Sequence, residues 1–337
     1  MKNSELTYKE IYGQPVSFQA INDTFDTIFK TLDEVFAEKY DEVIFTGCGT
    51  SLYLAQASAH AFSTCTGISA KGMCCSELYY FPETYVGNGK KVLVVPMTRK
   101  SYTTEVRMAI DKVRSYPGVK SLAITCDADN DYMLLSPETP EDSVIMTRSF
   151  TSMIYLAVVM SYYVGGKKEK IEQLKDYAAN AESFLKATDE MAKKIVAEHP
   201  ECNLFITLGQ GINYGIANEC MNKMKEMSLS NSEAYYTLEY RHGPMSLVDD
   251  KTLIILLGNE DTVDGDAKLL TQMKEYGAKV LAIGNNASKD FTDVDYTLDM
   301  PYGYDSLQNA PIIGFIGQLI GYYVAELKNL NADSPRH

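Results

Sequence analysis

Residues 44–49 read Ile-Phe-Thr-Gly-Cys-Gly, and residues 205–211 echo them as Phe-Ile-Thr-Leu-Gly-Gln-Gly, so that Gly47 and Gly209 stand 162 residues apart. Two more stretches recur at nearly this spacing: KVLVV at 91–95 returns as KTLII at 251–255, and GVKSLAI at 118–124 returns as GAKVLAI at 277–283. Three such echoes predict two copies of one α/β module. Each copy opens with an apolar strand, a glycine turn and a helix, the junction at which open α/β sheets hold phosphate.

The composition limits the class of protein. A chain of 337 residues with 45% hydrophobic residues fits two globular domains. A net charge of −14 argues against nucleic acid or an anionic membrane as a partner. Seven cysteines without paired CxxC motifs indicate neither a disulfide framework nor a metal site, so we expect reduced thiols and a cytoplasmic location. No signal peptide is expected, and the apolar stretches 153–164 and 312–327 are predicted as buried helices rather than membrane spans.

Strands alternate with helices in both copies, which predicts α/β modules with doubly wound parallel sheets and right-handed crossovers. A glycine pair and a charge run place the boundary at residue 166. Residues 1–166 are expected to hold a leading helix and the first module, and 167–337 a linking helix and the second. The expected strands are 42–46, 92–95, 121–125, 143–147, 204–208, 253–257, 280–283 and one near 296–298. The expected long helices are 16–40, 171–197 and 307–327.

Two loops of the first module are suited to a phosphate group, which needs several donors converging from one concave surface. Gly47 and Gly49 allow close backbone approach, and Thr50 and Ser51 add hydroxyls at the first helical turn. The next strand delivers a second loop with four hydroxyls and two cations, Thr98-Arg-Lys-Ser-Tyr-Thr-Thr104. For the first loop alone, a tight turn followed by an N-cap is the commoner explanation, and the second loop brings phosphate binding level with it.

The second module carries the acid–base residues. Glu219, Lys223 and Glu226 recur at i, i+4 and i+7 of a predicted helix, so they share one face, which by default is a solvated row of salt bridges. His242 stands before Gly-Pro at a turn with a restricted backbone. A lone histidine at a turn is more often structural than catalytic. The residues alone leave both interpretations open.

The ordered set of motifs resembles the SIS (sugar isomerase) family, above all the isomerase half of glucosamine-6-phosphate synthase and stand-alone sugar-phosphate isomerases and deglycases. Cys48-Gly-Thr-Ser51 is similar to the family's first phosphate loop, and Tyr240-Arg-His-Gly-Pro244 to its His-Gly-Pro turn. Residues 213–226 are similar to its helix of the form N-Y-x-x-A-x-E-x-x-x-K-x-K-E, and residues 141–151 to a ligand-lining stretch. The resemblance runs from about residue 40 to 336 and implies two SIS-type, flavodoxin-like modules of three layers each.

The resemblance also implies roles for individual residues. Glu226 would be the base that moves a proton between C1 and C2, and His242 would serve ring opening or leaving-group protonation, entering from a neighbouring subunit of a homodimer or higher oligomer. The phosphate of a sugar-phosphate substrate would be held by Ser51, Thr98, Arg99, Lys100 and Thr103. The substrate would be lined by Gly49, Thr50, Val144, Glu219 and Lys223. No metal and no cofactor is expected.

Some features depart from the family pattern. Where the family's second loop reads Ser-x-Ser-Gly-x-Thr, this chain has Lys100 in place of a serine and Ser101 in place of the glycine. The tail lysine and the glutaminase half of glucosamine-6-phosphate synthase have no match here. The leading prediction is therefore a deglycase of fructosamine-type 6-phosphates. The alternatives are an amino-sugar 6-phosphate isomerase or deaminase, and a sugar-phosphate sensor without catalysis.

Overall fold

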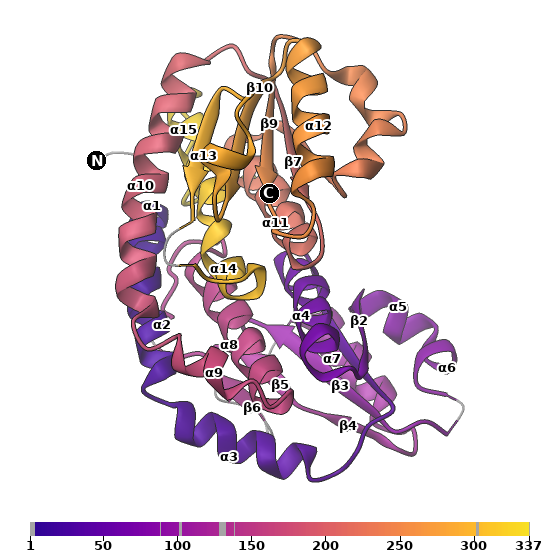
Figure 1. Ribbon diagram of the computed structural model, residues 1–337. Helices are drawn as coiled ribbons and strands as arrows, with labels where there is room; N and C mark the ends of the chain where they lie inside the picture. The colour runs from indigo at the N-terminus through magenta and orange to yellow at the C-terminus, as the bar shows by residue number, and fades with distance from the viewer. Residues whose placement is uncertain are drawn as a thin grey trace. The chain divides into compact units, whose positions relative to one another are not determined.

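The computed structural model describes residues 4–87, 89–100, 103–127, 133–137, 139–300 and 303–336. The chain forms two compact units, each built around one parallel sheet (Figure 1). The first-sheet unit comprises residues 14–140 and 148–178, and the second-sheet unit comprises residues 1–13, 141–147 and 179–337. The module boundary at residue 166 stays a prediction about where the sequence repeat divides.

The first sheet has the strand order β2-β1-β3-β5-β6, with β4 also paired to β3, and every pairing is parallel. Its central strands β1 and β3 are buried throughout, as expected for strands covered on both faces. The strands are β1 (Glu42–Gly47), β2 (Ser69–Cys74), β3 (Val92–Thr98), β4 (Val119–Ser121), β5 (Ala123–Thr125) and β6 (Met133–Leu135).

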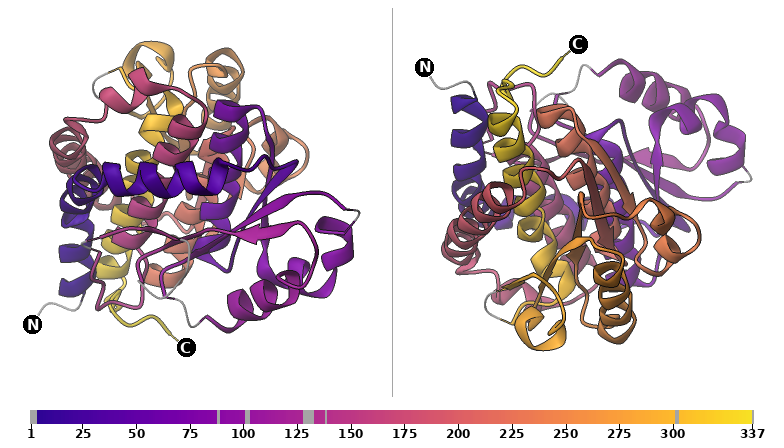
Figure 2. Two further views of the ribbon diagram at one scale, coloured as in Figure 1. Left: turned by 90° about the horizontal axis from the view of Figure 1, so that it is seen from below. Right: turned by 90° about the horizontal axis from the view of Figure 1, so that it is seen from above.

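Helices cover both faces of this sheet (Figure 2). On one face Ile44 packs with the apolar sides of α5 and α7, and on the other face Phe45 meets Phe62 of α4 with ring centroids 5.9 Å apart. Neighbouring residues of a strand point to opposite faces, which explains this division. The helices are α2 (Gln14–Asn22), α3 (Phe25–Phe36), α4 (Thr50–Thr66), α5 (Cys75–Tyr80), α6 (Pro82–Tyr85), α7 (Thr104–Val113), α8 (Arg148–Val164) and α9 (Lys168–Glu172).

The second sheet has the order β11-β10-β9-β7-β8, again all parallel. Counted in chain order from β7, this is 2-1-3-4-5, the flavodoxin-like order, and the first sheet follows it when β4 and β5 count as one strand. The predicted fold class of two doubly wound modules is confirmed. The strands are β7 (Leu204–Gly209), β8 (Asn231–Tyr235), β9 (Thr252–Leu257), β10 (Lys279–Gly284) and β11 (Tyr296–Asp299).

The remaining helices belong mainly to the second-sheet unit. Its helix α15 packs against α11 so closely that a Cβ on Gly317 would lie 2.4 Å from the sulfur of Cys220. By length and composition the stretch 306–327 could cross a membrane, but 83% of its apolar window is buried, so it is also explained as a core helix. The elements are α1 (Glu5–Tyr12), α10 (Tyr177–Glu198), α11 (Ile212–Ser228), α12 (Val263–Glu275), α13 (Ala287–Asp290), α14 (Ser306–Ile313), α15 (Phe315–Leu327) and the 3₁₀ turns η1 (Leu238–Arg241) and η2 (Pro244–Leu247).

Each of the three long helices expected from the sequence is divided in the structure. The leading helix breaks between α2 and α3, where the Thr24 hydroxyl and amide both donate to the carbonyl of Ile21. Short polar side chains compete in this way with the helical hydrogen bonds. The linking helix divides into α9 and α10, and the last helix divides at Gly314, three residues after a proline.

The expected strand over 143–147 was wrong: no strand forms there, and the edge strand that pairs with β5 is β6. The carboxylate of Glu10 in α1 accepts the backbone amides of Asp142 and Ser143 at 2.6 and 3.0 Å. A backbone whose amides are bound by a side chain has no donors left for a sheet ladder. The segment 141–147 is therefore an anchored loop of the second-sheet unit.

Candidate active site

The glycine turn between β1 and α4 has a backbone that only glycine can supply. A Cβ on Gly47 would lie 2.4 Å from the carbonyl oxygen of Ser51, so this strand end touches the first turn of the helix. Gly49 has a φ of +55°, a left-handed conformation that favours glycine. Thr50 and Ser51 follow at the start of α4, each only 6% exposed. The predicted first loop therefore has the compact geometry of a turn against which a small anion could be seated.

The second predicted loop leaves the neighbouring strand. The hydroxyl of Thr98, at the end of β3, donates to the carbonyl of Lys100 at 2.6 Å, and the hydroxyl of Thr103 reaches the same oxygen at 3.4 Å. Arg99 is half-buried and Lys100 is exposed. Ser101 and Tyr102 lie outside the described residues. Since β1 and β3 are parallel neighbours, both loops emerge at one edge of the first sheet.

A thiol pair lies beside the first loop, which the sequence did not single out. The Cys48 thiol hydrogen-bonds the thiol of Cys75, and this bond lowers the pKa of Cys48. The same bond, together with burial, raises the pKa of Cys75. Cys48 is half-exposed and stands two residues before α4, and a helix N-terminus favours a thiolate. Its place inside the glycine turn was the sequence signal that could have drawn attention to it.

The second sheet has a glycine turn of the same conformation after β7, but this turn lacks the hydroxyl donors found after β1. Gly211 has φ and ψ of 60° and −129°, against 55° and −126° at Gly49. At the position corresponding to Ser51 stands Asn213, whose amide donates to the carbonyls of Leu257 and Gly258 at 3.2 and 2.9 Å. This amide bridges the turn to the end of β9. The hydroxyl-lined turn is therefore particular to the first sheet.

The acid–base row on α11 is a buried ion triad. Lys223 is fully buried, with its Nζ 3.1 Å from Oε1 of Glu219 and 2.6 Å from Oε2 of Glu226. Burial by itself would lower the pKa of Lys223, but the two carboxylates outweigh it and hold the pKa above its usual value. Glu219 is also buried, whereas the Glu226 side chain is 36% exposed. The solvated row of salt bridges that this spacing usually indicates is therefore not what forms.

The exposed edge of this triad is the carboxylate of Glu226. Lys223 holds it from the buried side, so its orientation is fixed while part of its surface stays accessible. An oriented, accessible carboxylate is the group that a proton-transfer reaction requires as its base. The structure thus brings three of the predicted residues together and separates them by burial: Glu219 and Lys223 are buried, and Glu226 is partly exposed.

The loop that carries Val144 lies beside the same helix. Ile145 packs in one apolar cluster with Met227, the residue after Glu226, and with Tyr322 of α15. The neighbouring Val144 points outward, with 63% of its surface exposed. Val144, which was predicted to line the substrate, therefore lies on a loop next to Glu226 within the second-sheet unit.

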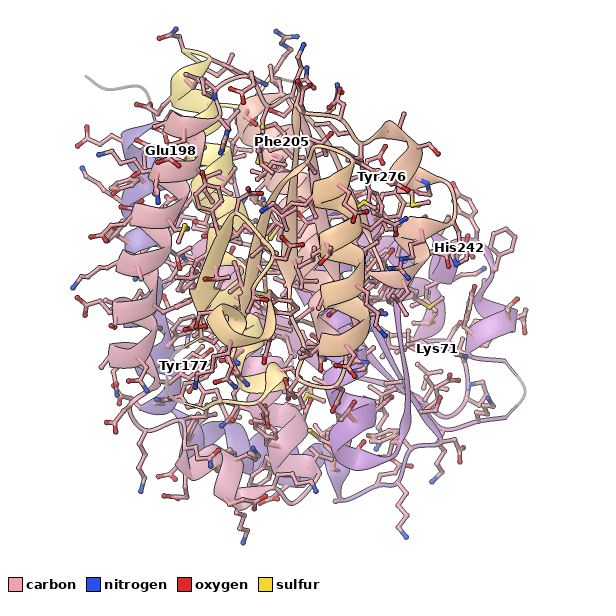
Figure 3. All side chains as sticks on the ribbon, turned by 45° about the horizontal axis from the view of Figure 1, so that its top comes forward. Lys71, Tyr177, Glu198, Phe205, His242 and Tyr276 are labelled. Carbon is pink, nitrogen blue, oxygen red and sulfur yellow. The ribbon has the colours of Figure 1, made fainter. Side chains whose placement is uncertain are left out.

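His242 is at the surface of the second-sheet unit (Figure 3). The backbone amide of His242 donates to the carbonyl of Glu239, and this hydrogen bond closes the end of η1. Gly243 follows with a φ of +119°. Within the described ranges no hydrogen bond or ion pair joins His242 to Glu226. An exposed imidazole fits the prediction that this residue serves a neighbouring subunit, which stays a prediction. Nor does any group of three or more His, Cys, Asp or Glu side chains in the described part of the chain have the geometry of a metal site.

Comparison with known proteins agrees with this geometry. Residues 201–327 match the family model of the SIS domain. Curated relatives include the isomerizing glutamine–fructose-6-phosphate aminotransferases of Buchnera aphidicola and Sulfurisphaera tokodaii, each 27% identical over 98% of this chain. The chain spans 57% and 55% of the lengths of these two relatives.

Solved structures match nearly the whole chain. The glucosamine-6-phosphate deaminase of Thermotoga maritima superposes with a TM-score of 0.81 at 26% identity, covering 99% of this chain and 98% of that one. The tagatose-6-phosphate ketose/aldose isomerase of Escherichia coli has a TM-score of 0.87 at 22% identity, covering 98% and 95%, which shows a shared fold. The predicted resemblance to phosphosugar enzymes is thereby confirmed.

Proposed function

We propose, on the premise that this chain carries a SIS domain over residues 201–327, that it is an enzyme which moves a proton between C1 and C2 of a nitrogen-bearing hexose 6-phosphate. The observation that carries the proposal is the triad on α11, in which a buried lysine orients a partly exposed carboxylate. The exposed part of Glu226 leaves an oriented carboxylate accessible to a ligand. Glu226 is the proposed base.

The reaction follows from one proton transfer. His242 would move a proton at the ring oxygen, so that the sugar opens and a carbonyl appears. Glu226 would then take a proton from the carbon next to that carbonyl, which gives an enaminol when nitrogen is attached, and return it to the neighbouring carbon. The product is an imine, and water cleaves it to a carbonyl and a free amine. Lys223 would hold the Glu226 side chain in place for both transfers.

The first-sheet loops would hold the phosphate. Ser51 and Thr98 supply hydroxyls at the edge where β1 and β3 end, and Arg99 and Lys100 supply positive charge. The phosphate takes no part in the chemistry, but fixing it limits the motion of the reacting carbons. Positioning of this kind contributes on the order of several kcal/mol to catalysis.

Two versions of the substrate are proposed. In the first, the nitrogen is on C1, and the enzyme is a deglycase that releases an amino acid from a fructosamine 6-phosphate; the altered second loop with Lys100 supports it. In the second, the nitrogen is on C2, and the enzyme is an amino-sugar 6-phosphate isomerase or deaminase. The similarity to the Thermotoga maritima deaminase along the whole chain supports the second version.

One experiment separates these versions from each other and from a sensor. The protein is incubated with glucosamine 6-phosphate and, separately, with 6-phosphofructosyl-lysine, and release of ammonia or lysine is followed. Release from one compound only identifies the position of the nitrogen. Binding of both without release of either would contradict the enzyme proposal and favour a non-catalytic sensor.

The base is tested with Glu226→Gln, for which we expect turnover to fall by at least about a thousandfold while the substrate still binds. The matched control is Glu275→Gln at the exposed end of α12, which changes the charge equally and should leave turnover within about twofold. A Glu226→Gln variant as active as the unmodified protein would remove Glu226 from this role.

A further inference from the structure

The second sheet has a cavity at the edge that corresponds to the phosphate loops of the first. It measures about 430 Å³ and lies where β7 and β9 end, so it occupies the switch point of a doubly wound sheet, the usual ligand position in such folds. All of its walls belong to the second-sheet unit. Its lining residues are Gln210, Leu238 and 260–266.

The charge of this cavity is opposite to that of the first-sheet loops. Four of its lining residues are acids, Glu260, Asp261, Asp264 and Asp266, and none is a lysine, arginine or histidine. Asp264 and Asp266 also stand in the first turn of α12, where the partial positive charge of the helix would otherwise favour an anion. A phosphate group is therefore excluded here by charge.

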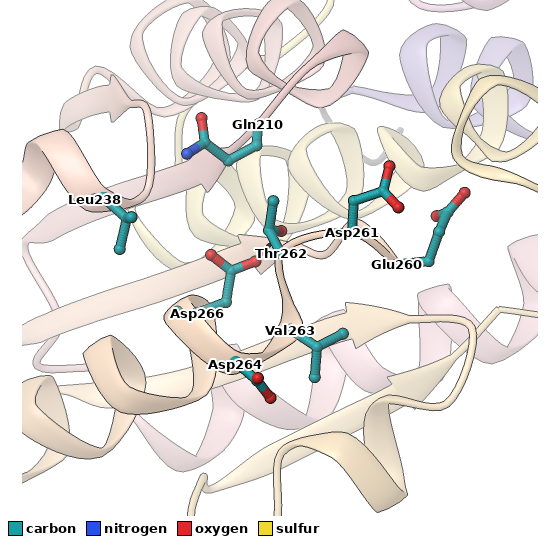
Figure 4. Close-up of a pocket in the computed structure, with 9 residues that line it drawn as sticks. Gln210, Leu238, Glu260, Asp261, Thr262, Val263, Asp264 and Asp266 are labelled. Carbon is teal, nitrogen blue, oxygen red and sulfur yellow. Dashed lines mark hydrogen bonds between the residues drawn. The ribbon is translucent and has the colours of Figure 1, made fainter.

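One of these acids is buried with an unused acceptor. Asp266 is 1% exposed, and its Oδ2 accepts the hydroxyl of Thr262 at 2.6 Å. Its Oδ1 has no well-formed hydrogen bond, although the similarly unpartnered hydroxyl of Thr237 lies close. Figure 4 shows the carboxylate turned toward the space between Leu238, Thr262 and Gln210. Burial raises the pKa of Asp266 to about 6, so near pH 8 this carboxylate is charged while its Oδ1 lacks a well-formed partner.

We propose that this cavity binds a small organic cation, a primary ammonium group that donates to Oδ1 of Asp266 and is surrounded by the other acids. The acids are too dispersed for a metal ion, because the described residues place no three carboxylate, imidazole or thiol groups within reach of one ion. An ammonium group needs only one strong acceptor and weaker contacts around it. The remaining volume admits an aliphatic chain against Leu238 and Val263.

The probe for this proposal is 1,4-diaminobutane, titrated calorimetrically into the whole protein at pH 8 and 0.15 M NaCl, with 1-butanol as the uncharged comparison. We expect the diamine to bind and the alcohol not to bind. Asp266→Asn keeps the shape and the Thr262 contact but removes the charge, and should weaken binding at least about tenfold, or 1.4 kcal/mol. The matched control Asp290→Asn, an exposed acid at the end of α13, should leave binding unchanged.

A second variant keeps the test decisive if Asp266→Asn folds poorly. Gly265 lines the cavity, and a Cβ there would meet only Leu238 at 3.5 Å, so Gly265→Val retains Asp266 and fills part of the space. This variant should also lose the diamine. The proposal is overturned if the unmodified protein does not bind the diamine at 10 mM, a concentration about a hundredfold above a Kd of 0.1 mM. It is also overturned if both cavity variants bind the diamine as tightly as the unmodified protein does. No substrate is present in this experiment, so its result does not depend on the proposed reaction.

Discussion

Lys223 is the residue on which the proposed chemistry depends most, although it is not the proposed base. A fully buried ammonium group is tolerated only when it is paired, and its two partners lie one turn away on either side of the same helix. The pair with Glu219 closes the buried side of the triad. The pair with Glu226 determines which way an accessible carboxylate faces.

Removing the charge of Lys223 should therefore affect both stability and reaction. In Lys223→Met the volume is nearly kept but Glu219 is left as a buried acid without its cation, so we expect the free energy of unfolding in urea to fall by about 3 kcal/mol. The difference between this variant and the unmodified protein should shrink at acidic pH, where Glu219 can be protonated. A loss below about 1 kcal/mol at pH 7 would show that the triad is not an electrostatic unit.

At the scale of elements, the close packing of α15 on α11 explains why the triad is buried. Gly317 and Gly321 are one turn apart on α15, and Cβ atoms there would lie 2.4 Å from the Cys220 sulfur and 3.2 Å from the Lys223 carbonyl. Only glycine lets the two helix backbones approach to this distance. The spacing of Glu219, Lys223 and Glu226 could not reveal this, because the residues that bury them stand about a hundred positions later.

This packing can be tested with a single methyl group. In Gly317→Ala the new Cβ conflicts with backbone and side-chain atoms of Cys220, so we expect thermal unfolding to show a loss of about 2 kcal/mol. Gly265→Ala is the comparison, since that glycine is also helical but has its nearest neighbour at 3.5 Å, and it should be neutral or slightly stabilising. Equal effects at the two positions would mean that helix propensity, not close approach, is being measured.

At the scale of the whole molecule, the sequence was enough to predict the two-module architecture, but not all of the strands at the edges of the sheets. The repeated stretches lie on the central strands and turns, which are apolar and therefore visible in the sequence. The edge strands β2 and β8 were missed, because Ser69–Cys74 and Asn231–Tyr235 are partly exposed and lack a continuous apolar run. The residues of the candidate site were named from motifs, but neither the burial of the triad nor the acidic cavity of the second copy could be read from them.

The two copies should differ in what they bind, and Cys48 offers a reporter for the first. Its lowered pKa and partial exposure should make it react with iodoacetamide near pH 7.5 well before Cys75, whose pKa is raised. A sugar phosphate seated on the neighbouring turn should slow this alkylation at least about fivefold, as measured by mass spectrometry of the peptides. Cys65, half-exposed near the other end of α4, should react at an unchanged rate. If the sugar phosphate slowed the alkylation of Cys48 and Cys65 equally, or slowed neither, the result would contradict a phosphate site at this turn.

The matching torsions at Gly49 and Gly211 have a practical consequence for protein engineering. Because Gly49 and Gly211 have nearly the same φ and ψ, Thr-Ser could be grafted onto positions 212 and 213 of a turn with matching torsions, although the graft removes the Asn213 bridge to β9. Combined with neutral replacements for the surrounding acids, such a graft would give the chain a second anion receptor, created by exchanging side chains on an existing frame.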